Sequence, residues 1–172
     1  MAIENTLQGV DGVKGVFHAA WDSWAEVCGI THEYSERGKV RINFGRIDRA
    51  GGTLAWSELA PLGNRSFLEQ RYDRREPWHV GLDRAEQFKV DLLAVASHEI
   101  GHAIGIDHIR TSGNLMNAIY NSQIRKPQEG DKRQGFHRYG PPTVEDPVLE
   151  WAEISINVGV DTYAGKIPKL GG

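Results

Sequence analysis

The segment SHEIGHAIGIDH at 97–108 constrains the fold more than any other part of the chain, because it holds three histidines at fixed spacing. His98 and His102 are four residues apart, and in a helix such residues lie on one face, one turn above each other. Their imidazoles can therefore point at one cation. His108 could join them only if the chain turned sharply after the helix. Gly105 permits this turn, because glycine readily adopts a positive φ.

The chemistry of these residue types points to a catalytic zinc ion. Three neutral imidazoles suit zinc, with Zn–N distances of about 2.0–2.1 Å, and three protein ligands leave a fourth position for water. Zinc lowers the pKa of that water to roughly 7 and polarises a carbonyl under attack. Glu99, next to the first ligand, can take the proton and pass it to a leaving amine. A helix with ordinary polar histidines is the alternative, but the register of Gly105 and His108 makes the pattern specific.

Hydrophobic spacing along the rest of the chain predicts a mixed fold. Apolar residues recur at helical spacing in two segments and alternate with polar residues, as in strands, in others. Glycines stand where several of these helices are expected to end. The segment 85–105 is apolar on most sides, so we expect it to cross the core. The predicted helices are 13–29, 85–105 and, from a weaker pattern, 127–140; the predicted strands are 39–45, 51–59, 65–73 and 153–160.

Length and composition limit the functional classes. A chain of 172 residues fits one domain, which we place at 1–142, with 143–172 as a C-terminal extension or linker after the chain-breaking GPPT. The net charge of −3 gives no electrostatic reason to expect nucleic acid or an anionic membrane as a partner. No apolar run reaches the ~20 residues of a membrane span, and the N-terminus lacks a signal-peptide pattern. The single cysteine, Cys28, excludes an intrachain disulfide and is expected to be a small buried residue.

Two motifs together resemble those of the metzincin zinc peptidases. His98, Glu99, His102, Gly105 and His108 match the zinc-binding motif, and SGNLMN at 112–117 matches the Met-turn, in which Met116 would form an apolar floor beneath the imidazoles. The resemblance is closest to the matrixin branch, over residues 10–142. It implies an α/β (α+β) fold with a twisted, mostly parallel five-stranded sheet, an antiparallel edge strand, about three helices and a cleft between two subdomains. Ile109 departs from the family, which usually has a small hydroxyl residue there.

The resemblance also implies how substrate binds. Matrixin-like proteins cut extended polypeptides, and a substrate strand would pair with an exposed edge strand. The residues of that edge are Gly52, Thr53, Leu54, Ala55 and Trp56. A specificity pocket beside the zinc would be lined by Ala94, His98 and a wall from Asn117 to Tyr120. A small residue at position 94 should leave the pocket deep and favour a large apolar residue after the cleaved bond. Tyr120 could instead be a packed surface aromatic.

Other metal sites of the matrixins are only partly matched. Trp56 and Arg71 occupy positions where the family has histidines for a structural zinc, so we expect no second zinc of that kind. Asp48, Asp73 and Glu76 match the carboxylates of a neighbouring calcium site, and oxygen ligands suit calcium. These carboxylates could instead pair with nearby arginines.

Several interpretations stay open at this point. We expect a secreted, monomeric zinc endopeptidase acting on a protein or peptide substrate, with secretion resting on the resemblance alone. The alternative is a catalytically silent zinc-containing binding module, which the presence of Glu99 disfavours. A peptidase that trims one dedicated partner is a third reading. Asp131 either supports the Met-turn or is an exposed helix-start aspartate. The remaining histidines lack ligand spacing and are expected to be surface or partly buried polar residues: His18, His32, His79 and His137.

Overall fold

The computed structural model describes most of the chain. The described residues are 7–33, 35, 38–61, 66–142, 151–158 and 161–168, and only the backbone is described for 7–10 and for the last two ranges. The helices are α1 (Leu7–Ala25), α2 (Leu92–Ala103) and α3 (Glu129–Tyr139). The strands are β1 (Val40–Gly45), β2 (Ala55–Ser57), β3 (Leu68–Asp73), β4 (Trp78–His79), β5 (Val90–Asp91), β6 (Trp151–Val158) and β7 (Asp161–Pro168).

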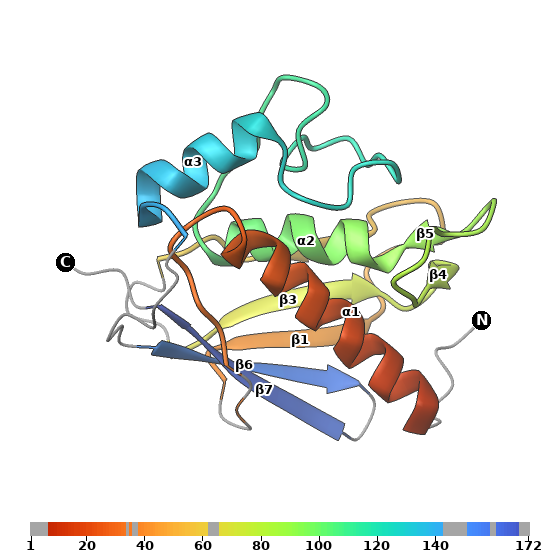
Figure 1. Cartoon of the computed structure of the whole chain (residues 1–172). Coiled ribbons are helices and arrows are strands. Elements are labelled where there is room, and N and C mark those ends of the chain that lie inside the picture. Colours follow the sequence, from red (N-terminus) through yellow and green to blue (C-terminus); the bar gives the residue numbers. More distant parts are fainter. Residues whose placement is uncertain are drawn as a thin grey trace.

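Five of these strands form one sheet in the order β2-β3-β1-β6-β7 (Figure 1). The inner strands β3, β1 and β6 are parallel, whereas the edge strands β2 and β7 are antiparallel to their neighbours. The predicted mixed sheet of five strands is therefore confirmed, with the difference that both edge strands, rather than one, are antiparallel. The predicted strand 153–160 corresponds to β6, so residues of the expected extension contribute to this sheet. The division at residue 142 stays a prediction.

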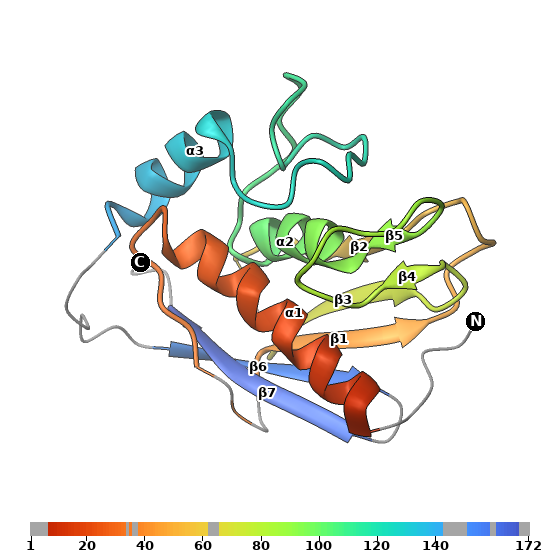
Figure 2. The ribbon, with the colours of Figure 1, turned by 45° about the vertical axis from the view of Figure 1, so that its right-hand side comes forward.

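The helices α1 and α2 pack side by side over the sheet and enclose the core (Figures 1 and 2). Phe17 of α1 meets Tyr72 of β3 edge to face, with ring centroids 5.3 Å apart. The indole Nε1 of Trp24 in α1 donates a hydrogen bond of 2.8 Å to the carbonyl of Ser97 in α2. Because Phe17, Trp24 and Tyr72 are fully buried, these contacts hold α1 against both the sheet and α2.

The predicted helix 85–105 begins seven residues later than expected, at Leu92. Asp91 caps it in an extended conformation (φ −73°, ψ 106°), and its Oδ1 accepts from the amide of Ala94. This cap fixes the helix start, as aspartate favours at this position. The residues before it follow another path: Phe88 has φ 68° and is 88% exposed, and Val90 pairs with Trp78 in a short parallel ladder.

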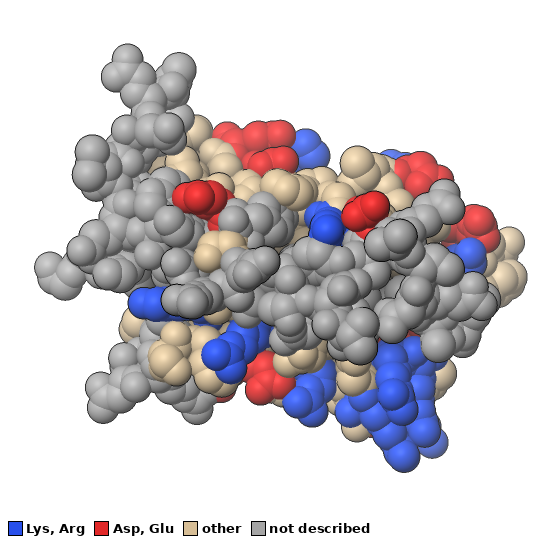
Figure 3. All heavy atoms as spheres, turned by 90° about the horizontal axis from the view of Figure 1, so that it is seen from below, with Lys and Arg blue, Asp and Glu red and all other residues tan. Residues whose placement is uncertain are grey.

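The third helix is closest to its prediction, whereas α1 begins at Leu7, six residues before the predicted start. α1 ends at Ala25 rather than at Gly29, and Cys28 is buried as expected, with its Sγ donating to the carbonyl of Trp24. Burial raises the pKa of this thiol to about 12. No helix of the described residues is long and apolar enough to cross a membrane. Viewed from below the sheet, the described surface carries both acidic and basic side chains (Figure 3).

Candidate active site

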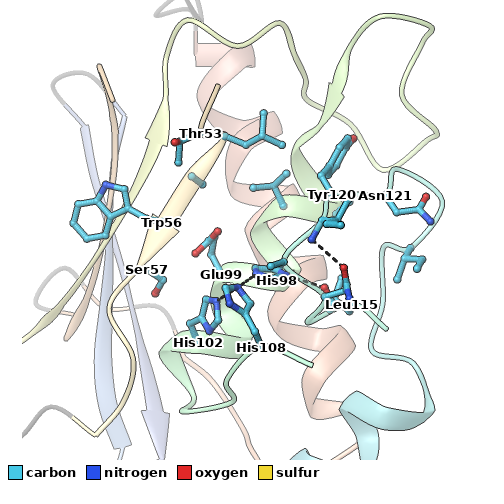
Figure 4. A pocket seen from close by; sticks show the side chains of 18 of the residues that line it. Thr53, Trp56, Ser57, His98, Glu99, His102, His108, Leu115, Tyr120 and Asn121 are labelled. Atoms are coloured by element: carbon cyan, nitrogen blue, oxygen red, sulfur yellow. Dashed lines mark hydrogen bonds between the residues drawn. The ribbon is translucent and has the colours of Figure 1, made fainter. Parts of the chain in front are cut away.

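The three predicted ligand histidines meet at one point beside α2 (Figure 4). His98 and His102 project from the same face of the helix, and His108 returns to them after the turn. The Nε2 atom of His108 lies 3.3 Å from Nε2 of His98 and 3.2 Å from Nε2 of His102. The turn depends on Gly105, which has φ 81° and donates to the carbonyl of His102, so the predicted role of this glycine is confirmed.

Two backbone carbonyls orient these imidazoles. Nδ1 of His98 lies 2.7 Å from the carbonyl oxygen of Leu115, and Nδ1 of His102 lies 2.9 Å from that of Ile106. A carbonyl only accepts hydrogen bonds, so each Nδ1 carries the proton and each Nε2 keeps its lone pair. Both lone pairs are thereby directed toward His108.

The site fits a zinc ion by donor type, spacing and charge. Bonds of about 2.0–2.1 Å in a tetrahedron place neighbouring ligand atoms about 3.3–3.4 Å apart, close to the Nε2 separations of 3.2 and 3.3 Å. Burial lowers the pKa of His98 to about 4, and burial also lowers the pKa of His102. Both imidazoles are therefore neutral near pH 7, as ligands must be.

Glu99 extends from α2 between the histidines and β2 (Figure 4). The residue is 5% exposed, and its Oε2 is buried with no hydrogen-bond partner among the described residues. Burial raises the pKa of this carboxyl to about 8. A buried acceptor without a partner is costly. Because Glu99 lines the cavity, a group that enters the cavity can reach its carboxylate.

Met116 is fully buried and contacts α2 at Gly101, between the two ligand histidines of that helix, and its role as a floor beneath the imidazoles stays a prediction. It packs against Gly101: a Cβ on this glycine would come within 2.3 Å of the Met116 sulfur and 2.9 Å of the Trp24 ring. The glycine between the two ligands of α2 therefore gives Met116 room to approach the helix backbone.

Asp131 supports the Met-turn from α3. Its side chain is fully buried and accepts hydrogen bonds from the amides of Leu115 (2.7 Å), Met116 (3.0 Å) and Gln128 (2.7 Å). This contact pattern decides between the two interpretations of Asp131: it is the support rather than an exposed aspartate. One carboxylate thus ties the start of α3 to the turn that holds Met116.

A cavity of about 520 Å³ opens above the histidines and is bounded by two walls (Figure 4). One wall consists of the predicted edge residues, Gly52 to Trp56, together with Ser57. Of these, Ala55 to Ser57 form β2, an edge strand of the sheet. The other wall is the segment after the Met-turn. The predicted pocket residues Ala94, Asn117 and Tyr120 all line this cavity. The structure therefore brings the expected substrate-binding residues to one place.

Two residues that position the second wall were missed from the sequence. The hydroxyl of Tyr120 accepts from the amide of Asp91 (2.8 Å), and the carboxylate of Asp91 forms an ion pair with Arg125 (2.9 Å). Arg125 also donates to the carbonyls of Leu82 and Asp83. The signal for Asp91 was present, because an aspartate before an apolar run is a typical helix cap. Nothing in the local sequence indicates Arg125.

The predicted calcium residues surround one loop. Asp73 accepts from the amides of Ile47 and Asp48, and Glu76 accepts from that of Gly51. Asp48 accepts from the amide of Thr53 through Oδ2, while its buried Oδ1 has no partner among the described residues. These carboxylates organise the loop before β2, and calcium binding there stays a prediction.

Trp56 and Arg71, which stand where the family has zinc-binding histidines, are direct cross-strand neighbours in β2 and β3. The Arg71 guanidinium lies 5.7 Å from the Trp56 ring centroid, within cation–π range. The absence of a structural zinc in this region stays a prediction.

Comparison with known proteins agrees with the site. The sequence model of the family described as matrixin matches residues 3–138. The chain is 29% identical to mouse (Mus musculus) stromelysin-3, covering 87% of this chain and 31% of that protein. It is 27% identical to human (Homo sapiens) matrix metalloproteinase-17, covering 91% and 25%, and 30% identical to human matrix metalloproteinase-19, covering 90% and 32%. The chain thus spans between a quarter and a third of the length of these relatives.

Proposed function

The chain belongs to the matrixin family, and from this premise we propose that it is a zinc-dependent endopeptidase acting on extended polypeptides. His98, His102 and His108 would hold one catalytic zinc ion. The observation that carries the proposal is that Nε2 of His108 lies within 3.3 Å of Nε2 of both His98 and His102, in the lining of a cavity that also contains the buried Glu99. The names of the relatives, stromelysin and matrix metalloproteinase, agree with this class of reaction.

Each part of the site has a role in peptide hydrolysis. When bound, zinc supplies a Lewis acid and lowers the pKa of a water at its open position to roughly 7. Burial raises the pKa of Glu99 to about 8, and a cation held by the adjacent histidines would favour its ionised form. In that form Glu99, placed between the histidines and β2, would accept the proton of the attacking water and return it to the departing amine. The carbonyls of Leu115 and Ile106 keep two imidazoles in the tautomer that presents Nε2. Met116 and Asp131 hold the floor of the site in place.

The substrate would lie along β2 as an added strand. An edge strand offers unpaired amide and carbonyl groups, and an extended peptide can pair with them whatever its side chains. Such pairing gives affinity, while a side-chain pocket gives specificity. The pocket is the space beside Ala94 and Tyr120, where the side chain after the cleaved bond would enter.

Removal and return of metal test this function directly. We expect the chelated protein to lose cleavage of casein and of extended peptides, and zinc to restore it. Zinc held by the three histidines without any cleavage would instead support the silent binding module. Cleavage that persists after complete chelation would contradict the proposal. Analysis of the same preparation for calcium tests the predicted site at Asp48, Asp73 and Glu76.

The pocket makes a prediction about specificity. Ala94 is 3% exposed and lines the cavity, so Ala94→Phe should fill the space for the side chain after the cleaved bond. We expect kcat/KM for peptides with leucine at this position to fall by roughly 10–200-fold, and kcat/KM for peptides with alanine there to change little. The alanine peptide is the internal control, because misfolding would affect both substrates equally. An equal loss for both peptides, or an unchanged leucine preference, would place the pocket elsewhere.

A further inference from the structure

A second group of metal-binding side chains lies on α1, outside the residues that line the cleft. His18 and Asp22 are one turn apart on the helix, and His32 returns to them from the following segment. Ligand atoms of the three residues lie within 4.8 Å of one another, and Nε2 of His32 is 3.4 Å from Oδ1 of Asp22. Within the described part of the chain, only this group and the catalytic histidines bring three such residues together.

His18 is exposed and His32 is partly buried, as expected, but their spacing along the chain did not predict that they meet. Spacing along the chain reveals ligands on one helix, but His32 reaches α1 through a turn whose path the sequence does not specify. Asp22 was also overlooked, although it stands four residues after His18 and so shares its helix face.

The position of His32 is fixed by buried structure. Its ring stacks on Trp21, with centroids 5.8 Å apart and planes 29° apart, and Trp21 is fully buried. The chain reaches His32 through a buried turn, in which Cys28 bonds to Trp24 and the amide of Gly29 donates to the carbonyl of Gly140. The side chain of His32 is 8% exposed, whereas that of Asp22 is 59% exposed. The imidazole of His32 is thus held in place, while the exposed side chains of His18 and Asp22 can change rotamer to complete the coordination of a metal ion.

The donor set selects the class of cation. Two imidazoles and one carboxylate suit zinc and the neighbouring late first-row metals, whereas calcium and magnesium prefer oxygen ligands alone. The His32–Asp22 separation of 3.4 Å matches the spacing of about 3.3–3.4 Å between neighbouring ligands of tetrahedral zinc. Burial lowers the pKa of His32 and of His18, which leaves both rings neutral near pH 7 despite the opposing effect of Asp22.

We propose that His18, Asp22 and His32 form a second site for zinc or a similar divalent transition metal, which joins α1 to the segment leading toward β1. It lies apart from the Trp56–Arg71 region and is not the structural zinc of the matrixins. A cation bound here favours the native state, because the ligands come from two segments that meet only when the chain is folded. The role of the site is stabilisation of the helix on which α2 packs.

The site is tested in the full chain with the catalytic ligands removed. The variant His98→Ala/His102→Ala keeps a single catalytic histidine, so zinc bound by it at micromolar concentration reports on α1. We expect equilibrium dialysis to give one zinc per chain for this variant. We expect Tm to rise by roughly 5–10 °C when zinc is about a hundredfold above Kd. Adding Asp22→Ala should weaken binding by at least about tenfold, since changing even an outer partner of a ligand costs that much.

A matched control separates this site from ordinary surface binding. His79 and Asp83 form another histidine–aspartate pair, four residues apart in sequence like His18 and Asp22, with Nε2 of His79 3.1 Å from Oδ1 of Asp83. Asp83→Ala in the same background should leave the affinity for zinc unchanged. His18→Ala gives a second, exposed ligand variant. The proposal is overturned if the background variant binds no zinc, if Asp22→Ala and His18→Ala bind it unchanged, or if Asp83→Ala weakens binding equally. Stabilisation by calcium alone would also overturn it.

Discussion

Replacing Glu99 with glutamine is expected to lower kcat for peptide cleavage by about 10²–10⁴-fold, the range that general acid–base catalysis contributes. Glutamine keeps the size of the side chain but can neither accept the proton of the attacking water nor return it. The three histidine ligands are untouched, so zinc content should stay at the wild-type level. The measurement is kcat with a fluorogenic peptide, together with metal analysis of the same sample.

The control for this experiment is Glu86→Gln. Glu86 has a side chain that is 69% exposed and pairs with Lys89, so its loss should leave kcat unchanged. If Glu99→Gln cleaved at the wild-type rate with full zinc, Glu99 would not be the base. If it lost zinc together with activity, its role would be in metal binding instead.

Replacing Asp131 with alanine is expected to destabilise the protein by about 3–5 kcal/mol. The carboxylate accepts from three amides, those of Leu115, Met116 and Gln128, and is fully buried. Each buried donor left without a partner costs about 1–3 kcal/mol. For a chain of this size the loss corresponds to a fall in Tm of roughly 6–20 °C. Denaturant unfolding measures the free energy, and thermal unfolding checks it.

Two further variants show whether the loss of stability comes from the hydrogen bonds of Asp131. Glu129→Ala lies in the same first turn of α3 but is exposed, so it should change stability by less than about 0.5 kcal/mol. Asp131→Asn keeps the volume and one acceptor oxygen, and should fall between alanine and wild type. A loss below about 1 kcal/mol in Asp131→Ala would mean that the Met-turn holds its shape without α3.

The sequence predicted the centre of the site better than its surroundings. The ligand trio and the turn at Gly105 follow from helix geometry and glycine's access to positive φ, which are local rules. The start of α2 was placed too early because residues 85–91 continue the apolar pattern, and hydrophobic spacing alone does not reveal where a cap interrupts it. Asp91 supplied that cap, and its own sequence signal was outweighed by the pattern.

Contacts between segments far apart in the chain could not be predicted from the sequence. Asp131 had two readings, because only the folded chain shows which amides lie within its reach. Arg125 contacts residues more than forty positions away, and no local rule selects it. The cluster on α1 was missed for the same reason, since the turn after the helix decides where His32 lies.

The carbonyls of Leu115 and Ile106 fix the tautomers of two histidines, and a main-chain atom persists through almost any substitution at its own residue. The position of the proton on each of these two imidazoles therefore depends on the path of the backbone and not on which side chains Leu115 and Ile106 carry. Substitutions in the two walls of the cavity could therefore change which peptides the proposed enzyme accepts, while these carbonyls keep the two imidazoles in the same tautomer.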